Sequence, residues 1–220
     1  MIFETGHIYH IYNQGNNRQK IFFKDENYLL FLRKMREYII PYADILAWCL
    51  MPNHFHIMIY LNTLDIKISD SLSQRTDSLS PRETICIEER ETICIENKVT
   101  KLRTFNDSIG FLIRSYTQAI NKQEKRTGSL FKSHTKAECV TRTEGITPSY
   151  FNTSSGTQIN VRIPEKEYPI VCWNYIHNNP VTSKIVDRAE DYEYSSYRDF
   201  IGLRDGKLIN KNRAKEFGLI

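Results

Sequence analysis

Apolar and polar positions alternate near the N-terminus and then change to a helical spacing. Residues 6–13 (GHIYHIYN) alternate as a half-buried strand does. A polar NQGNNR turn follows, in which we expect Gly15 to take a positive φ. Apolar residues then recur at steps of four, three and four. This spacing predicts a helix that has Asp25 as its cap and that Pro41 ends.

Two apolar runs joined by a short connection come next. Residues 45–50 (ILAWCL) predict a buried strand, residues 54–61 (HFHIMIYL) predict the return strand, and together they predict a hairpin. Helical spacing returns at 107–125, and 129–140 (SLFKSHTKAECV) predict a further strand.

A last helix is expected in the C-terminal third. Pro169 is expected to begin it, and Pro180 is expected to end it near Asn178. The order of elements predicts an α+β fold of the ferredoxin-like β-α-β-β-α-β type, in which an antiparallel sheet carries helices on one face. The last helix is additional to that unit. Such a fold hosts many activities, so it does not indicate one.

Two segments interrupt this order. Residues 63–105 contain two copies each of DSLS and RETICIE, which indicates local duplication, and residues 141–164 are rich in Thr, Ser, Gly and Asn. The TICIE runs alternate and are also compatible with a small hairpin. We interpret both segments as insertions into a single domain spanning 1–220, because loops absorb such additions at little cost.

Composition excludes several classes of protein. The 220 residues are 40% hydrophobic and 25% charged, as in soluble globular proteins. No run approaches the roughly 18 apolar residues of a membrane span, and the N-terminus does not resemble a secretory signal. Five cysteines without a CxxC pair argue against a disulfide framework or a thiolate zinc site. We therefore expect a cytoplasmic protein.

Charge is compatible with a phosphate-bearing partner. The net charge is +4, but residues 80–96 hold two arginines and five glutamates and so carry −3. The remainder therefore carries +7, which permits a nucleic-acid partner without requiring one.

The sequence His54-Phe55-His56 lies in the second of the paired strands. Residues i and i+2 of a strand point to the same face, so both imidazoles project together while Phe55 points into the opposite layer. Two parallel imidazoles suit a divalent metal. The alternative is a pair of histidines on a half-exposed strand.

The last expected helix brings a phenol and an amide together. Tyr175 and Asn179 are four residues apart, so they share a helix face. Asn179 precedes a proline at the expected end, which makes the spacing argument approximate there. The alternative is a helix with a polar C-terminal turn and with Tyr175 packed on the sheet.

These two motifs together resemble a known family. CLMPNHFHIMI, followed far downstream by NYIHNNPV, resembles the HUH single-tyrosine transposases and, more narrowly, the REP-associated tyrosine transposases. GHIYHIYNQGNNR, SYTQAINKQEKRTGSLF and DYEYSSYRDFIG extend the resemblance over the chain outside the two insertions. The chain departs from the family at Asn178, where an apolar residue is usual, and near His134 and Thr135, where an aromatic residue is usual.

The resemblance implies a site and a reaction. His54, His56 and Asn179 match the family's ligands for one Mg²⁺ or Mn²⁺, and Tyr175 matches its nucleophile. Attack on a phosphate of single-stranded DNA would give a 5′-phosphotyrosine and a free 3′-hydroxyl, which can later rejoin strands. Asn178 is left open as an alternative ligand, and His177 is expected to have a positioning or structural role.

The implied partner is single-stranded DNA at the foot of a hairpin, bound by a protein that the resemblance favours as a monomer over a homodimer. Bases could stack on Tyr9, Tyr12, Phe131 or Trp173, although each is also a candidate core residue. The cations available for phosphate contacts are Arg18, Lys20, Arg114, Lys122, Lys125, Arg126, Lys132 and Lys136.

Two other functions remain open at this stage. A non-catalytic ferredoxin-like nucleic-acid-binding module would need exposed aromatics on its strands but no histidine pair aligned with a tyrosine. A metal hydrolase using His54 and His56 would need a third histidine or carboxylate, and none has a convincing spacing.

Overall fold

A computed structural model of the chain describes residues 1–68, 101–142, 152–153, 156–157 and 164–220. The strands are β1 (Ile8–Gln14), β2 (Ala43–Met51), β3 (His54–Leu61), β4 (Asp65–Ile68), β5 (Lys101–Thr104), β6 (Lys136–Cys139), β7 (Asn152–Thr153) and β8 (Gly156–Thr157). The helices are η1 (Asn16–Arg18), α1 (Asp25–Tyr38), α3 (Phe105–Gln123), α4 (Pro164–Thr182), η2 (Ala189–Asp191), α5 (Tyr197–Phe200) and α6 (Lys211–Glu216).

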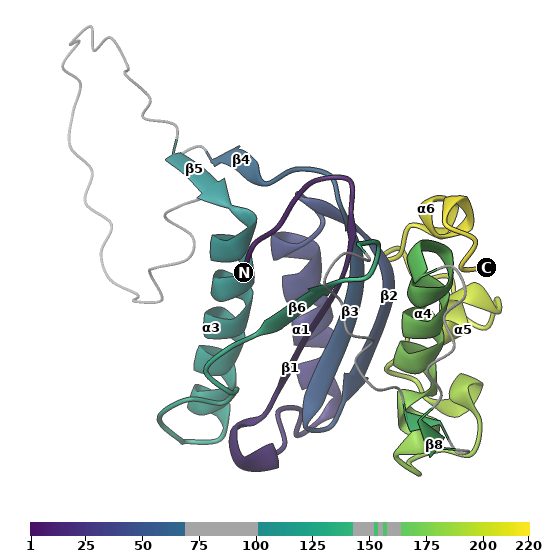
Figure 1. Ribbon diagram of the computed structural model, residues 1–220. Coiled ribbons are helices and arrows are strands. Elements are labelled where there is room, and N and C mark those ends of the chain that lie inside the picture. The colour runs from purple at the N-terminus through teal and green to yellow at the C-terminus, as the bar shows by residue number, and fades with distance from the viewer. Residues whose placement is uncertain (69–100, 143–151, 154–155, 158–163) are drawn as a thin grey trace, which may run out of the picture.

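A four-stranded sheet in the order β2-β3-β1-β6 forms the centre of the molecule (Figure 1). All three pairings are antiparallel, and β2 and β3 form the expected hairpin. The expected α+β class with an antiparallel sheet is therefore confirmed. The repeats DSLS and RETICIE lie outside the described residues.

Helices cover both faces of this sheet. α1 and α3 lie on one face, and α4 with α5 and α6 lies on the other (Figure 1). Alternation along β3 explains the two layers, because Phe55, Ile57 and Ile59 join the core beneath α1 and α3. Met58 points the other way and joins the core beneath α4 with Ile176. The histidines of β3 share that second face.

Two sequence-based element boundaries are wrong. The strand expected at 129–140 is confined to β6, and the helix expected to begin at Pro169 begins at Pro164 and continues through Pro180. Each proline removes one N–H donor and crowds the carbonyl of residue i−4, and the burial of Cys172, Trp173 and Ile176 against the sheet offsets this cost. The end of α4 is closed by two further bonds, from the Ser183 N–H to the Asn179 carbonyl and from the Ile185 N–H to the Pro180 carbonyl, both 2.9 Å.

The turn after β1 also differs from expectation. Gly15 has φ −56°, whereas Asn17 and Arg18 have positive φ. Gly15 is needed for another reason: a Cβ at this position would lie 2.1 Å from the Gln19 carbonyl oxygen. Its N–H donates to the Asn53 carbonyl at 2.7 Å, so this close turn holds the loop against the β2–β3 connection.

Side chains close the beginnings of α1 and α3. Asp25 is the first residue of α1 and not its cap, which is Lys24. Asn27 Oδ1 accepts from the N–H groups of Phe23 and Lys24 at 3.0 and 3.2 Å. In α3, Thr104 Oγ1 accepts from the Asp107 N–H at 3.1 Å, and Asp107 Oδ2 accepts from the Thr104 N–H at 3.3 Å. This reciprocal pair is a capping box.

The ends of the first expected insertion belong to the described fold. β4 and β5 pair antiparallel, with Ile68 opposite Lys101. Tyr42 Oη donates to the Arg103 carbonyl at 2.9 Å, and Phe105 is 1% exposed in the core. Both ends of the segment 63–105 therefore pack on the domain.

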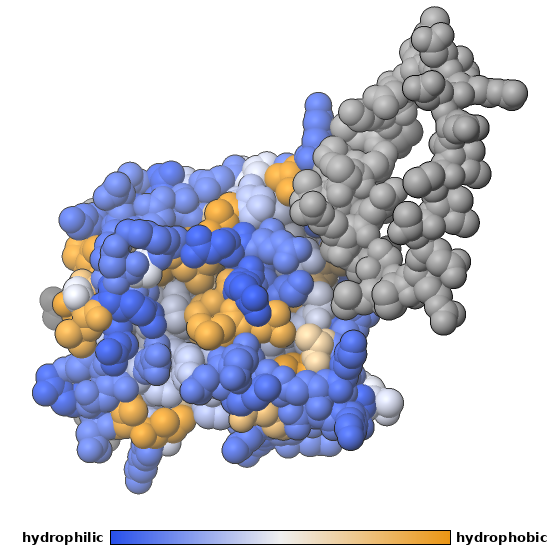
Figure 2. All heavy atoms as spheres, turned by 180° about the vertical axis from the view of Figure 1, so that it is seen from behind, coloured by the Kyte–Doolittle hydropathy of each residue, from blue (hydrophilic) through white to orange (hydrophobic). Residues whose placement is uncertain are grey.

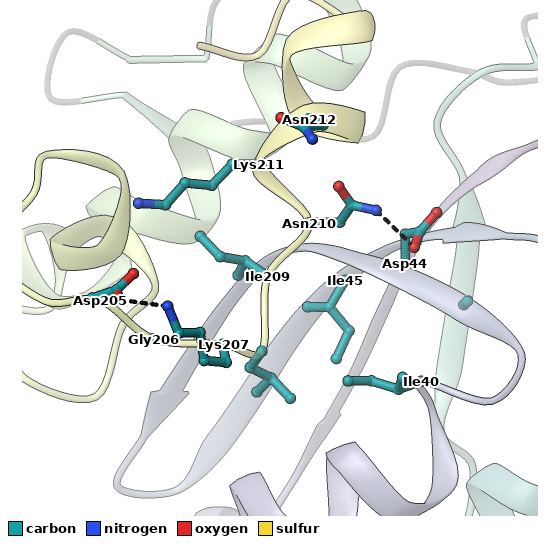
Figure 3. Close-up of a pocket in the computed structure, with 12 residues that line it drawn as sticks. Ile40, Asp44, Ile45, Asp205, Gly206, Lys207, Ile209, Asn210, Lys211 and Asn212 are labelled. Atoms are coloured by element: carbon teal, nitrogen blue, oxygen red, sulfur yellow. Dashed lines mark hydrogen bonds and ion pairs between the residues drawn. The ribbon is translucent and has the colours of Figure 1, made fainter.

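The residues that follow α4, 183–220, form a C-terminal segment that covers the free edge of β2. The Leu50 N–H donates to the Tyr194 carbonyl at 2.9 Å, and the Asn210 N–H donates to the Ile45 carbonyl at 2.8 Å. Figure 3 shows Asn210 beside a hollow of about 420 Å³, where its Nδ2 also donates to Asp44 Oδ1 at 2.9 Å. The edge strand is thus paired within the chain, which protects it from other strands.

Candidate active site

Two histidines of β3 and two residues of α4 meet over the sheet. His54 and His56 have ring centroids 5.0 Å apart, and the Tyr175 ring lies edge-on to His56 at 5.4 Å. Asn179 lies between the two imidazoles, with its Oδ1 3.1 Å from His54 Nε2 and its Nδ2 3.2 Å from His56 Nε2. The i, i+2 pair of β3 and the i, i+4 pair of α4 therefore meet at one site.

Phe55 separates this group from the other layer. Its ring packs against Phe31 of α1 at 5.0 Å, on the opposite face of β3. The strand is thus fixed on one side by an aromatic core and presents both imidazoles on the other. A shift by one residue would exchange the two sets, so the packing of Phe55 fixes which face carries the histidines.

A pocket of about 290 Å³ opens beside these residues. Its cations are Lys132 and Lys136, which bring positive charge to the histidines. Tyr12 Oη donates to Glu138 Oε1 at 2.5 Å, which joins β1 to β6 at the wall. The lining residues are Tyr12, Asn13, Gln14, His54, His56, Lys132, His134, Lys136 and Tyr175. Such a pocket could admit a phosphate group next to the phenol.

Burial keeps the two histidines neutral. It lowers the pKa of His56 well below the ordinary histidine value, and the neighbouring His10 and His54 lower it further. Burial also lowers the pKa of His54, whereas the Asn179 side-chain oxygen, which would accept from the charged imidazole, acts in the opposite direction. A neutral imidazole has one nitrogen lone pair, which is what a metal ligand requires.

Proton placement identifies the nitrogen lone pair that His54 turns toward Asn179. Asn53 Oδ1 can only accept, so the contact of 2.6 Å with His54 Nδ1 places the His54 proton on Nδ1. His54 Nε2 is then a lone pair that faces Asn179 Oδ1, a second acceptor. Two acceptors facing each other suit a cation, and nitrogen with amide oxygen donors fits Mn²⁺ or Mg²⁺.

The donor set contains no carboxylate or thiolate. Within the described ranges, no three His, Cys, Asp or Glu side chains form a group that could hold a metal. The third donor is the amide of Asn179, which is 7% exposed. The neighbouring Asn178 is exposed, whereas the Asn179 side chain contacts both imidazoles, so the geometry favours Asn179 over Asn178.

Tyr175 is half-buried against the site. Burial raises the pKa of its phenol, and a hydrogen bond with Asn179 acts in the opposite direction. The phenol is therefore protonated at neutral pH and must lose its proton when it reacts.

His177 faces away from the pocket. It is 1% exposed, and its Nε2 lies 2.7 Å from Ser196 Oγ in the C-terminal segment. Its ring packs edge-on against Trp173 at 4.1 Å. This places His177 in the packing between α4 and the segment that covers β2.

The expected DNA contacts are only partly brought together. Lys132 and Lys136 line the pocket, and the Arg18 carbonyl accepts from Asn53 Nδ2 at 3.4 Å at the same end of the sheet. Arg114 lies on α3, in the layer behind the sheet, where its guanidinium packs on Phe111. Lys20, Lys122, Lys125 and Arg126 are in the loops and the helix end near Leu130 and do not line the pocket.

Of the four aromatics considered for base stacking, one reaches the pocket. Tyr12 is half-buried and lines it, whereas the other three are core residues less than 9% exposed, namely Tyr9, Phe131 and Trp173. Their alternative interpretation as core residues therefore holds.

Sequence reasoning missed His10. It lies on β1, and its Nε2 is 2.9 Å from Nδ1 of His56. Burial lowers the pKa of His10 to about 3. The alternation of β1 places His10 on the same face as Tyr12. Only the pairing of β1 with β3 brings His10 next to His56, the second histidine of the His54-Phe55-His56 motif.

A larger hollow lies elsewhere on the surface. It measures about 610 Å³ and lies between α1 and the C-terminal segment, with Leu29, Trp48 and Leu208 among its lining residues. On the face opposite to the view of Figure 1, apolar side chains gather near the middle with hydrophilic ones around them (Figure 2). The hollow of about 610 Å³ is lined by no histidine, and no asparagine or glutamine lies beside its tyrosine in the lining, in contrast to the arrangement at the smaller pocket.

The structure is similar to that of a REP-associated tyrosine transposase. The matched structure shows that protein bound to a REP hairpin, with 13% sequence identity, a TM-score of 0.49, and coverage of 92% of this chain and 83% of that chain. No family model matches the chain, and a search of curated proteins finds no match. The likeness concerns the fold alone.

Proposed function

We propose that this chain is a divalent-metal-dependent enzyme that nicks single-stranded DNA and transfers strands through a 5′-phosphotyrosine at Tyr175. The observation that carries the proposal is the position of Asn179. Its amide contacts both His54 and His56, and the same side chain acts to lower the pKa of Tyr175 on the same helix. One side chain thus connects a set of metal donors with a nucleophile.

The residues would divide the reaction between them. His54, His56 and Asn179 would hold the ion, which when bound neutralises charge on the scissile phosphate. Tyr175 Oη would attack phosphorus, lose its proton to solvent or a pocket group, and form the phosphotyrosine. The bond to the 3′-oxygen breaks, and that oxygen leaves as a hydroxyl after taking a proton.

The pocket also accounts for positioning. Lys132 and Lys136 would place phosphate oxygens beside the phenol through charge attraction. The reverse reaction needs only an incoming 3′-hydroxyl at the same place, because the phosphotyrosine conserves the bond energy. The proposed substrate is single-stranded DNA next to a hairpin.

The polarity of the adduct tests the proposal. Single-stranded hairpin oligonucleotides labelled at the 3′ end should transfer their label to the protein in the presence of Mn²⁺, whereas 5′-labelled ones should release a shorter fragment with a 3′-hydroxyl. Retention without an adduct would favour a nucleic-acid-binding module. Free hydrolysed ends would favour a metal hydrolase.

Tyr175→Phe should lower the rate of adduct formation by a factor of at least about 10³. Metal binding and hairpin binding should be nearly unchanged. Phenylalanine keeps the ring that packs on His56 and removes only the oxygen. Tyr116→Phe is the control, because Tyr116 is fully buried and its Oη donates to the Ile21 carbonyl at 2.7 Å. Adduct formation by Tyr175→Phe, and its loss in Tyr116→Phe, would reverse the assignment.

Asn179→Ala should slow cleavage by about 10- to 100-fold, and high Mn²⁺ should restore part of it, since two imidazoles still hold the ion. Asn178→Ala is the matched control one residue away, at an exposed position outside the pocket. Equal rates for the two variants would mean that the amide of Asn179 has no part in the reaction.

A further inference from the structure

His10 forms the back of the proposed metal site. It is 6% exposed on β1, and its ring stacks on His56 with centroids 5.0 Å apart and planes at 27°. Its Nε2 is 2.9 Å from His56 Nδ1. The same ring lies edge-on to Tyr175 at 6.1 Å, so one side chain contacts both a proposed ligand and the proposed nucleophile.

The direction of the bond between the two histidines follows from their partners. Asn179 Nδ2 is a donor, so His56 Nε2 must be its acceptor at 3.2 Å and carries no proton. The proton of a neutral His56 is then on Nδ1, and it is donated to His10 Nε2. The lone pair of His56 therefore points toward Asn179 and His54.

His54 is arranged in the same way by a different group. Asn53 Oδ1 accepts from its Nδ1, which leaves its Nε2 facing Asn179. Each proposed ligand thus has one acceptor behind it that fixes the tautomer and the ring orientation. Outer partners of this kind raise the basicity of metal-binding histidines.

We propose that His10 is a positioning residue that accepts the Nδ1 proton of His56 and so directs the Nε2 lone pair of His56 toward the metal. This inference rests on the proposed metal site. His10 itself is not a ligand here, because its Nε2 is used by His56. It acts on the reaction only through the orientation and basicity of the His56 ring.

Two substitutions separate an acceptor from a space-filling ring. In His10→Gln, the side-chain oxygen lies about as far from the backbone as the histidine Nε2 and can accept the same proton. His10→Phe fills the space but cannot accept. Tyr9→Phe is the control on the opposite face of β1, where Tyr9 belongs to the core beneath α1 and α3.

The experiment measures metal affinity and tautomer separately from activity. Mn²⁺ titration by calorimetry should show a loss of about 10- to 100-fold for His10→Phe, a small loss for His10→Gln and none for Tyr9→Phe. Nitrogen-15 NMR of the metal-free wild type should show His56 protonated on Nδ1. Unfolding midpoints of all variants identify those that lose affinity merely by failing to fold.

The results separate the role of His10 from the presence of the metal site. Mn²⁺ binding by His10→Phe within about twofold of wild type would overturn the role of His10 while leaving the metal site intact. Equal losses in His10→Phe and His10→Gln, or a His56 proton on Nε2, would also overturn it. A wild-type protein that binds no Mn²⁺ would overturn the proposed metal site and His10's role together. Because the NMR measurement uses the wild type, it decides the tautomer even if His10→Phe does not fold.

Discussion

Three buried histidines bear on how the stability of this fold depends on pH. His10, His56 and His177 are each less than 7% exposed. Burial lowers the pKa of His10 and of His177 to about 3, from an ordinary value of 6.5. A group that stays neutral in the folded state while its unfolded counterpart takes up a proton favours unfolding as the pH falls.

We expect the free energy of unfolding to fall as the pH drops below about 6.5, and to continue falling toward about 3. Above 6.5 both states are neutral at these positions, so the effect is absent there. Each buried histidine contributes up to about 1.4 kcal/mol per pH unit within this window. Urea unfolding at pH 7.5, 6.5 and 5.5 in the presence of a chelator measures it.

His177→Gln provides the matched comparison, because glutamine can still bond to Ser196 Oγ but does not titrate. In this variant, the free energy of unfolding should decline less steeply between pH 6.5 and 5.5. The difference in slope should correspond to about one proton fewer taken up on unfolding. An unchanged slope would show that His177 is protonated in the folded state.

Single side chains were predictable where a local spacing decides them. The i, i+2 pair of His54 and His56 needs only a strand, and the i, i+4 pair of Tyr175 and Asn179 needs only a helix. His10 could not be found in this way, because its partner is 46 residues away and depends on which strands pair. Gly15 was singled out for the wrong reason, since the crowding by Gln19 appears only in three dimensions.

At the level of elements, the type was more predictable than the ends. The hairpin of β2 and β3 and the helices α1 and α3 follow their hydrophobic periods. The extent of α4 was misjudged because Pro169 and Pro180 were given too much weight as helix boundaries. Burial of Cys172, Trp173 and Ile176 against the sheet stabilises this helix despite both prolines.

The paired strands β4 and β5 indicate how the first insertion can be shortened. Replacing 69–100 with a short Gly/Asn turn should preserve cooperative unfolding and adduct formation, since Ile68 and Lys101 already lie opposite each other. Circular dichroism melts and the 3′-label assay test it. Loss of the cooperative transition would mean that the removed residues contribute to the core.

Replacing the wider segment 63–105 is the informative comparison. It removes the Thr104 cap of α3 and the buried Phe105, which together should cost about 4 kcal/mol or more of stability. A melting temperature equal to that of the shorter replacement would contradict the packing of these flanks.

One edge of the central sheet is closed within the chain. The edge of β2 pairs with the segment around Tyr194 and Asn210, so it is not open to a second copy. We expect light scattering after gel filtration to give about the 26.0 kDa of one chain. A stable dimer of the intact chain would contradict this.

Shortening the chain after Gly206 should release part of that edge. It removes the Asn210 N–H that bonds to the Ile45 carbonyl and the Arg213 ion pair with Asp44. The shortened protein should self-associate at concentrations where the intact chain does not, as measured by light scattering.

None of the helices in the described parts of the chain is long and apolar enough to cross a membrane.

The position of α4 in the chain has a consequence for biosynthesis. A ribosome makes the histidine strand β3 and its supporting helices long before it makes Tyr175 and Asn179. A nascent chain can therefore fold its α1 and α3 side while the opposite face of the sheet still waits for α4 and the segment that follows. The chain acquires the proposed nucleophile and the proposed amide ligand only late in synthesis, so an incomplete polypeptide that ends before α4 carries the two imidazoles and lacks both of these residues.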